Sequence, residues 1–114
     1  MAKVKYVLLL PLTYNDGTSV PKNIRDQILD EIFLLAGGYH CGAIGEGAYR
    51  MKGGQKQIDV SQEVWIVIEE EDEAALKRLA GRFAAMLGQE TIYLECTSGK
   101  PEFIPPSPVG GLFE

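Results

Sequence analysis

VKYVLLLPL at residues 4–12 and VWIVI at residues 64–68 are the two stretches that decide the fold. Both are typical of β-strands, and both are apolar at consecutive positions, which places apolar side chains on both faces of each strand. The rest of the chain carries signals for only two helices, and two helices cover one face of a small sheet. We therefore expect a second copy of the chain to cover the other face, through the predicted interface residues Val7, Leu9, Trp65 and Val67.

Turn and capping signals place the first helix directly after the first strand. Asn15-Asp16-Gly17 is a strong turn signal, and Thr18 or Ser19 is predicted to cap the helix. Pro21 suits the first helical turn, because its missing N–H would have no partner there. Gly37-Gly38 predicts the end of the helix, and its apolar stripe consists of Ile24, Ile28, Leu29, Ile32, Phe33 and Leu35.

A glycine-rich segment follows and predicts a β-hairpin. We expect the second strand over residues 43–51, with a bulge at Gly45 or Gly47, because glycine inside a strand often marks a bulge. Gly53-Gly54 supplies the hairpin turn. The third strand then begins as early as Gln57 and runs through residue 68.

The acidic run at residues 69–73 opens the second helix, because the helix dipole favours negative side chains at this end. Asp72 is a candidate cap. Consecutive carboxylates on a helix point in different directions, which favours a solvated helix end over a metal site. Gly88 ends the helix and residues 91–96 form the fourth strand; the apolar face of the helix consists of Leu76, Leu79, Ala80, Phe83 and Leu87.

The resulting order, βαββαβ, predicts a ferredoxin-like α+β fold, with a four-stranded antiparallel sheet and both helices on one face. In that fold the first and third strands are central, which agrees with the strands that are apolar on both faces. Residues 1–98 form this domain. Residues 99–114 are rich in proline and glycine, and we interpret them as an arm that lies on its own domain or on a neighbouring copy.

Composition narrows the function classes. The 114-residue chain has a net charge of −5 and no basic stripe, which argues against nucleic-acid binding. No stretch reaches the roughly 18–20 apolar residues of a membrane span. The two cysteines, Cys41 and Cys96, are far apart and have no metal-site or redox-motif spacing. We expect a reduced cytoplasmic protein without a cofactor.

Five polar residues are candidates for binding a small ligand. His40 is the only histidine, and its neighbour Cys41 would point to the opposite face of a strand, so a metal site is not predicted. Glycines around the other candidates let the backbone approach a ligand, although GAIGEG at residues 42–47 lacks the spacing of a dinucleotide-binding loop. The predicted ligand-binding residues are His40, Glu46, Tyr49, Arg50 and Glu63.

Glu63 has two readings. The hairpin brings it opposite residues 42–46, where it is either a solvated carboxylate at a strand end or a pocket residue with a raised pKa. Arg50 and Lys52 are the basic residues best placed to hold an anionic ligand at a subunit boundary. No Ser/His/Asp or Cys/His set can be assembled, so no catalytic residue is assigned.

Short motifs resemble those of a family of uncharacterised bacterial ferredoxin-like proteins: a G-x-G-x-[YW] strand, a glutamate opening the next strand, and GQE before the last strand. The matching residues are Gly45, Gly47, Tyr49, Glu63, Gly88, Gln89 and Glu90. This resemblance implies the fold and no activity. A looser likeness is to PII-like signalling proteins, which share the element order and bind nucleotides between subunits. This chain lacks their long loop between strands two and three.

Three functions fit these observations. The first is a homo-oligomer, dimeric or trimeric, that binds a small molecule without turnover in a cleft between subunits formed by residues 15–19 and 42–52. The second is an enzyme of the dimeric α+β barrel type, in which His40, Tyr49 and Glu63 transfer protons inside a pocket between paired sheets. The third is an assembly module that recruits another protein.

Overall fold

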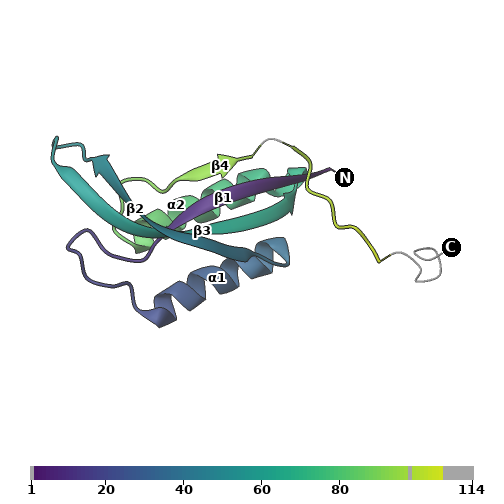
Figure 1. Ribbon diagram of the computed structural model, residues 1–114, viewed down its shortest axis with the longest axis horizontal. Helices are drawn as coiled ribbons and strands as arrows, with labels where there is room; N and C mark the ends of the chain where they lie inside the picture. The colour runs from purple at the N-terminus through teal and green to yellow at the C-terminus, as the bar shows by residue number, and fades with distance from the viewer. Residues whose placement is uncertain (1, 98, 107–114) are drawn as a thin grey trace.

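The computed structural model describes residues 2–97 and 99–106. Four strands and two longer helices alternate along the chain in the predicted order (Figure 1). The elements are β1 (Lys3–Pro11), α1 (Lys22–Ala36), β2 (His40–Arg50), β3 (Lys56–Glu69), the short 3₁₀ helix η1 (Glu70–Asp72), α2 (Glu73–Met86) and β4 (Leu94–Cys96).

The strands form one antiparallel sheet in the order β2-β3-β1-β4, so β1 and β3 are central, as predicted. Their alternate side chains meet the two helices in a single core, in which Leu8, Ile66 and Phe83 have at most 1% of their surface exposed. The chain therefore has the α+β, ferredoxin-like architecture that the sequence predicts. Neither helix in the described part of the chain is long and apolar enough to cross a membrane.

The face of the sheet that lies away from the helices, called here the outer face, carries the predicted interface residues. Val7 pairs with Trp65 in the β1–β3 register, and Val67 and Leu9 belong to the same alternation. These side chains are half-buried or exposed, and Trp65 keeps 38% of its surface accessible. The placement of the four residues is as predicted, and their role in oligomerisation stays a prediction.

Several boundaries differ from the sequence predictions. β2 begins at His40, and its register shifts between Cys41 and Ile44, so the bulge lies at Gly42 and Ala43 and not at Gly45 or Gly47. A side-chain network explains the location. Gln62 accepts a 2.6 Å hydrogen bond from Arg25 Nη2 of α1 and donates one of 3.2 Å to the carbonyl of Gly42, which holds the widened strand in place.

The N-terminal caps of both helices also differ from the sequence predictions. Pro21 occupies the N-cap position of α1, and no side chain caps the helix. Of the predicted caps, Thr18 donates hydrogen bonds to the Asp16 carboxylate from its amide (2.9 Å) and its hydroxyl (2.6 Å), and Ser19 pairs with Thr13. Asp72 occupies the N-cap position of α2 but makes no capping hydrogen bond. Gly37 and Gly88 end the helices as predicted, both at positive φ.

The fourth strand and the arm complete the chain. β4 has only the three residues Leu94–Cys96, shorter than the predicted 91–96, because the preceding segment bends to contact the hairpin and the loop after β1. Residues 99–106 pass the start of β1 (Figure 1), and residues 101–103 border a cavity on the outer face together with Trp65 and Val67. The remaining part of the predicted arm, residues 107–114, lies outside the described residues.

Candidate functional site

Two adjoining cavities on the outer face form the candidate site, which we call the sheet groove. The first has a volume of about 220 Å³ and the second about 460 Å³. Both are lined by Leu9, Tyr49 and Ser61, so β1, β2 and β3 each contribute to the shared wall. The groove lies where the β2–β3 hairpin approaches the segment before β4.

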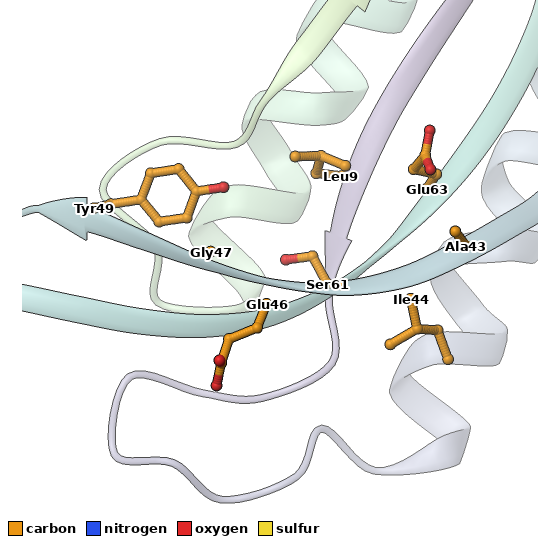
Figure 2. Close-up of a pocket in the computed structure, with 9 residues that line it drawn as sticks. Leu9, Ala43, Ile44, Glu46, Gly47, Tyr49, Ser61 and Glu63 are labelled. Atoms are coloured by element: carbon orange, nitrogen blue, oxygen red, sulfur yellow. The ribbon is translucent and has the colours of Figure 1, made fainter.

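The first cavity brings polar and apolar side chains together on one side of the sheet. Figure 2 shows Leu9, Tyr49, Ser61 and Glu63 on the same side of β2. Ile44 and Glu46 border the cavity, but their side chains extend to the opposite side of the strand. The β2–β3 register has the same alternation, since Gly45 pairs with Ser61 and Glu46 with Val60.

Gly47 explains where the Tyr49 ring lies. Both residues point to the outer face, and a β-carbon at residue 47 would be 2.7 Å from the Tyr49 hydroxyl oxygen and 2.9 Å from a ring carbon. The ring therefore occupies the space that a side chain at residue 47 would need. The tyrosine keeps 45% of its surface exposed, so part of this residue is accessible to a ligand.

Glu63 is positioned by the bulge in β2. A β-carbon at Gly42 would be 3.5 Å from the Glu63 β-carbon and 3.4 Å from the Trp65 indole nitrogen. The predicted approach of Glu63 to the start of the glycine-rich segment is therefore confirmed. The Arg25–Gln62–Gly42 network holds this part of the wall from the helix side of the sheet.

The second cavity extends the groove toward the hairpin tip. Its charged lining residues are Arg50, Asp59 and Glu90. Asp59 has only 8% of its surface exposed, although it lies on the outer face. Its Oδ1 is buried and has no hydrogen-bond partner among residues 2–97 and 99–106. A buried carboxylate oxygen without a partner costs free energy, and Asp59 is the residue of the cavity lining that has one.

The GQE residues join the loops at this end of the groove. Glu90 Oε1 accepts a 3.2 Å hydrogen bond from the amide of Lys52 at the hairpin tip. Gln89 Nε2 donates a 3.0 Å hydrogen bond to Asn15 Oδ1, and Asn15 Nδ2 donates one of 3.2 Å to the Gly88 carbonyl. The motif thus attaches both the hairpin and the loop after β1 to the segment before β4.

Tyr93 adds a second aromatic ring to the wall of the second cavity. The negative charge of Glu95 raises the pKa of the Tyr93 phenol, with smaller contributions from desolvation, a hydrogen bond to Glu95 and the nearby Tyr49. All four contributions favour the neutral phenol, so Tyr93 is an uncharged aromatic side chain at neutral pH.

His40 lies at the other end of the outer face and not in the groove. Its ring centroid is 4.9 Å from that of Trp65, and Lys5 Nζ lies 4.1 Å from the Trp65 ring centroid. These side chains line a separate cavity of about 590 Å³, which residues 101–103 of the arm also border.

The structure therefore divides the predicted ligand-binding residues. Tyr49 and Glu63 come together in the first cavity, Arg50 lines the second, Glu46 points away and His40 packs on Trp65. Sequence reasoning missed Ser61 and Asp59, although the period-2 alternation from Glu63 places both residues on the same face. The loop at residues 15–19 contributes through Asn15, which contacts the GQE segment.

No cluster of three His, Cys, Asp or Glu side chains that could hold a metal ion occurs within the described ranges. The side chains of the groove are instead those that contact an organic ligand, namely two tyrosine rings, a leucine, a serine hydroxyl and carboxylates.

Comparisons with known proteins show that the fold of this chain is similar to that of solved structures. No protein-family model matches the chain, and no curated protein matches it. A solved structure of a phage SAM lyase in complex with S-methyl-5'-thioadenosine is similar, with a TM-score of 0.65 at 18% identity over 84% of this chain and 81% of that chain. A phage SAM lyase in the apo state is similar with a TM-score of 0.60 at 14% identity, over 90% of this chain and 92% of that chain. At these identities, the chain and the phage lyases share a small α+β fold.

Proposed function

We propose that this protein binds a small adenosine-containing thioether or sulfonium compound in the sheet groove. The observation that carries the proposal is the groove itself, which combines the exposed Tyr49 ring with Leu9, Ser61 and Glu63 on one face. A phage SAM lyase with the same fold, of which the match covers 81%, is in complex with S-methyl-5'-thioadenosine. The second cavity alone, about 460 Å³, lies within the size range of small-ligand sites, roughly 300–1,000 Å³.

Each part of such a ligand has a matching group in the groove. An adenine ring would stack on Tyr49, since aromatic rings prefer offset or edge contacts with one another. The ribose hydroxyls would donate hydrogen bonds to the Glu63 carboxylate. They would donate to or accept from the Ser61 hydroxyl, which can do both. A methylthio group would contact Leu9. The proposed contacts use Tyr49 and Glu63 from the ligand-binding residues predicted from the sequence, and they lie within one subunit, whereas the sequence predicted a cleft between subunits.

The experiment is calorimetric titration with S-methyl-5'-thioadenosine. We expect binding by the wild-type protein, weakened about tenfold or more in Glu63→Gln and Tyr49→Ala, because each loses a direct contact. Glu46→Gln is the matched control: it makes the same chemical change in the same strand pair, but the side chain points away from the groove. Equal losses in Glu46→Gln and Glu63→Gln would place the ligand elsewhere.

Cleavage of a sulfonium is the second candidate. The Glu63 carboxylate and the Tyr49 hydroxyl lie in one cavity, so a proton acceptor and a proton donor are available beside a bound ligand. In a balanced elimination, Glu63 would accept a proton from the carbon next to the S–CH2 carbon, the electrons of that C–H bond would form a C=C bond, and the sulfur would leave with the S–C bonding pair as a neutral thioether. Incubation with S-adenosylmethionine and mass-spectrometric detection of S-methyl-5'-thioadenosine tests this candidate. If Glu63→Gln loses the release of S-methyl-5'-thioadenosine and Glu46→Gln keeps it, the cleavage activity is assigned to the sheet groove.

We also propose that the protein is a homo-oligomer, a dimer or a trimer, that associates through Val7, Leu9, Trp65 and Val67. The half-exposed apolar side chains of the outer face support this proposal, because such a patch is unusual on a monomer. Leu9 also lines the sheet groove, so a second copy on this face would cover the open side of the ligand site.

A further inference from the structure

Asp59 is the residue of the sheet groove that the proposed contacts do not use. It lies in β3, two residues before Ser61 on the same face, and pairs with Gly47 across the β2–β3 ladder. Its side chain is more than nine-tenths buried, and it lines the second cavity. Oδ1 has no solvent access and no hydrogen-bond partner among the described residues.

The basic residue in the same cavity lining does not form an ion pair with this carboxylate. Arg50 lines the same cavity, but the ion pairs among the described residues are Lys3–Glu69, Lys22–Asp26 and Arg82–Glu31. A buried carboxylate oxygen without a partner is unfavourable. Glu31 and Glu69 also have one such oxygen, but each of them forms an ion pair through its other oxygen, whereas Asp59 forms no ion pair within the described ranges. Asp59 thus places a carboxylate without an ion pair in the lining of a cavity of about 460 Å³, and its remaining 8% of exposed surface is the part that a ligand can contact.

The surroundings of Asp59 indicate the charge of that partner. Tyr49 and Tyr93 line the same cavity, and the electron-rich faces of tyrosine rings attract cations. Glu90 adds a second carboxylate to the lining. A carboxylate beside aromatic rings is the combination that recognises a small organic cation, because one group pairs with the charge and the others replace its water.

We propose that Asp59 is a specificity-determining residue that binds the cationic group of the ligand, a sulfonium or a primary ammonium. The inference rests on the proposed function, because it assigns the charge preference of the same groove. Asp59 would therefore select S-adenosylmethionine, which carries both cationic groups, over the uncharged S-methyl-5'-thioadenosine.

Three ligands and two variants test the assignment. Calorimetry would compare S-adenosylmethionine, S-adenosylhomocysteine, which has the ammonium but no sulfonium, and S-methyl-5'-thioadenosine. In Asp59→Asn we expect affinity for S-adenosylmethionine to fall by about 10- to 100-fold, because a charge-assisted contact is lost, while affinity for S-methyl-5'-thioadenosine changes less than about threefold. Asp30→Asn, at an exposed position on α1, is the control with the same change in net charge.

The ligand pattern separates the two cations. An equal loss for S-adenosylhomocysteine would assign Asp59 to the ammonium, and no loss for it would assign the sulfonium. If Asp59→Asn weakens all three ligands equally or none of them, the assignment is overturned while the proposed function stands. If the wild-type protein binds none of the three, the proposed function is overturned and the assignment with it.

The ligand-free protein gives a second readout. Removing an unpaired buried charge should leave the melting temperature of Asp59→Asn unchanged or raise it. A fall of several degrees relative to Asp30→Asn would show that Asp59 has a structural partner in the free protein, and would overturn the assignment.

Discussion

The Tyr49 ring lies across Gly47, at a distance that leaves no space for a β-carbon at residue 47. A β-carbon there would meet the Tyr49 hydroxyl oxygen at 2.7 Å, whereas the backbone of Gly47 is not among those with positive φ. In Gly47→Ala we therefore expect the ring to move and the backbone to stay. The affinity for S-methyl-5'-thioadenosine should fall about as far as in Tyr49→Ala, with a change in melting temperature of only a few degrees.

Gly81→Ala is the control for this prediction. Gly81 lies on α2 outside the sheet groove, and a β-carbon there would meet nothing within 4 Å. This variant should bind normally, as measured by the same titration. Normal binding by Gly47→Ala as well would show that the position of the Tyr49 ring does not matter to the ligand.

Gln62 is predicted to stabilise the bulge that positions Glu63. Gln62→Leu removes the acceptor of Arg25 and the donor to the Gly42 carbonyl, leaving two polar groups without their partner. We expect the free energy of unfolding to fall by about 1–3 kcal/mol, measured by urea denaturation. Gln27→Leu, on the exposed side of α1, should change it by less than about 0.5 kcal/mol. Equal values for the two variants would contradict a role for the network.

Trp65 tests the proposed oligomer. Trp65→Asp would place an unpaired charge in the apolar contact between copies, so the mass in solution should fall to that of the 12.5 kDa monomer in light-scattering chromatography. Phe33→Asp is the control, because Phe33 is 54% exposed on α1, away from the outer face. A Trp65→Asp protein with the wild-type oligomeric mass would show that the outer face is not the interface.

Tyr6 predicts a pH dependence of stability. Burial, with the charges of Glu73 and Cys96, raises the pKa of its phenol to about 12 in the folded state, from 10.0 when exposed. Above pH 10 the unfolded chain loses this proton while the folded protein retains it, so the free energy of unfolding decreases as pH rises from 10 to 12. The stability contribution of Tyr6 is therefore fully present below pH 10.

The comparison with Tyr6→Phe isolates this residue from the other tyrosines. Urea denaturation at pH 8, 10 and 11 should show a smaller decrease for Tyr6→Phe than for the wild-type protein. Parallel decreases would mean that the phenol of Tyr6 titrates alike in both states.

Part of the candidate site follows from local sequence alone. Period-2 alternation along β3 places Glu63 and Trp65 on one face, and glycines in β2 mark where a tyrosine ring can lie close to the backbone. His40 could not be placed in the same way. Its position depends on the two-residue bulge that follows it, and that bulge is set by Arg25 and Gln62, which lie far away in the sequence.

The sequence by itself determined the order of elements, the central positions of β1 and β3, and the glycine ends of both helices, because these depend on hydrophobic periodicity and on local backbone conformation. Only the tertiary structure decided that Asp59 is buried without a partner and that the GQE segment meets the hairpin tip. The Lys52–Glu90 contact joins residues 38 positions apart, and the cavity that Asp59 lines is formed by β1, β2, β3 and the segment before β4, so no local pattern encodes either feature.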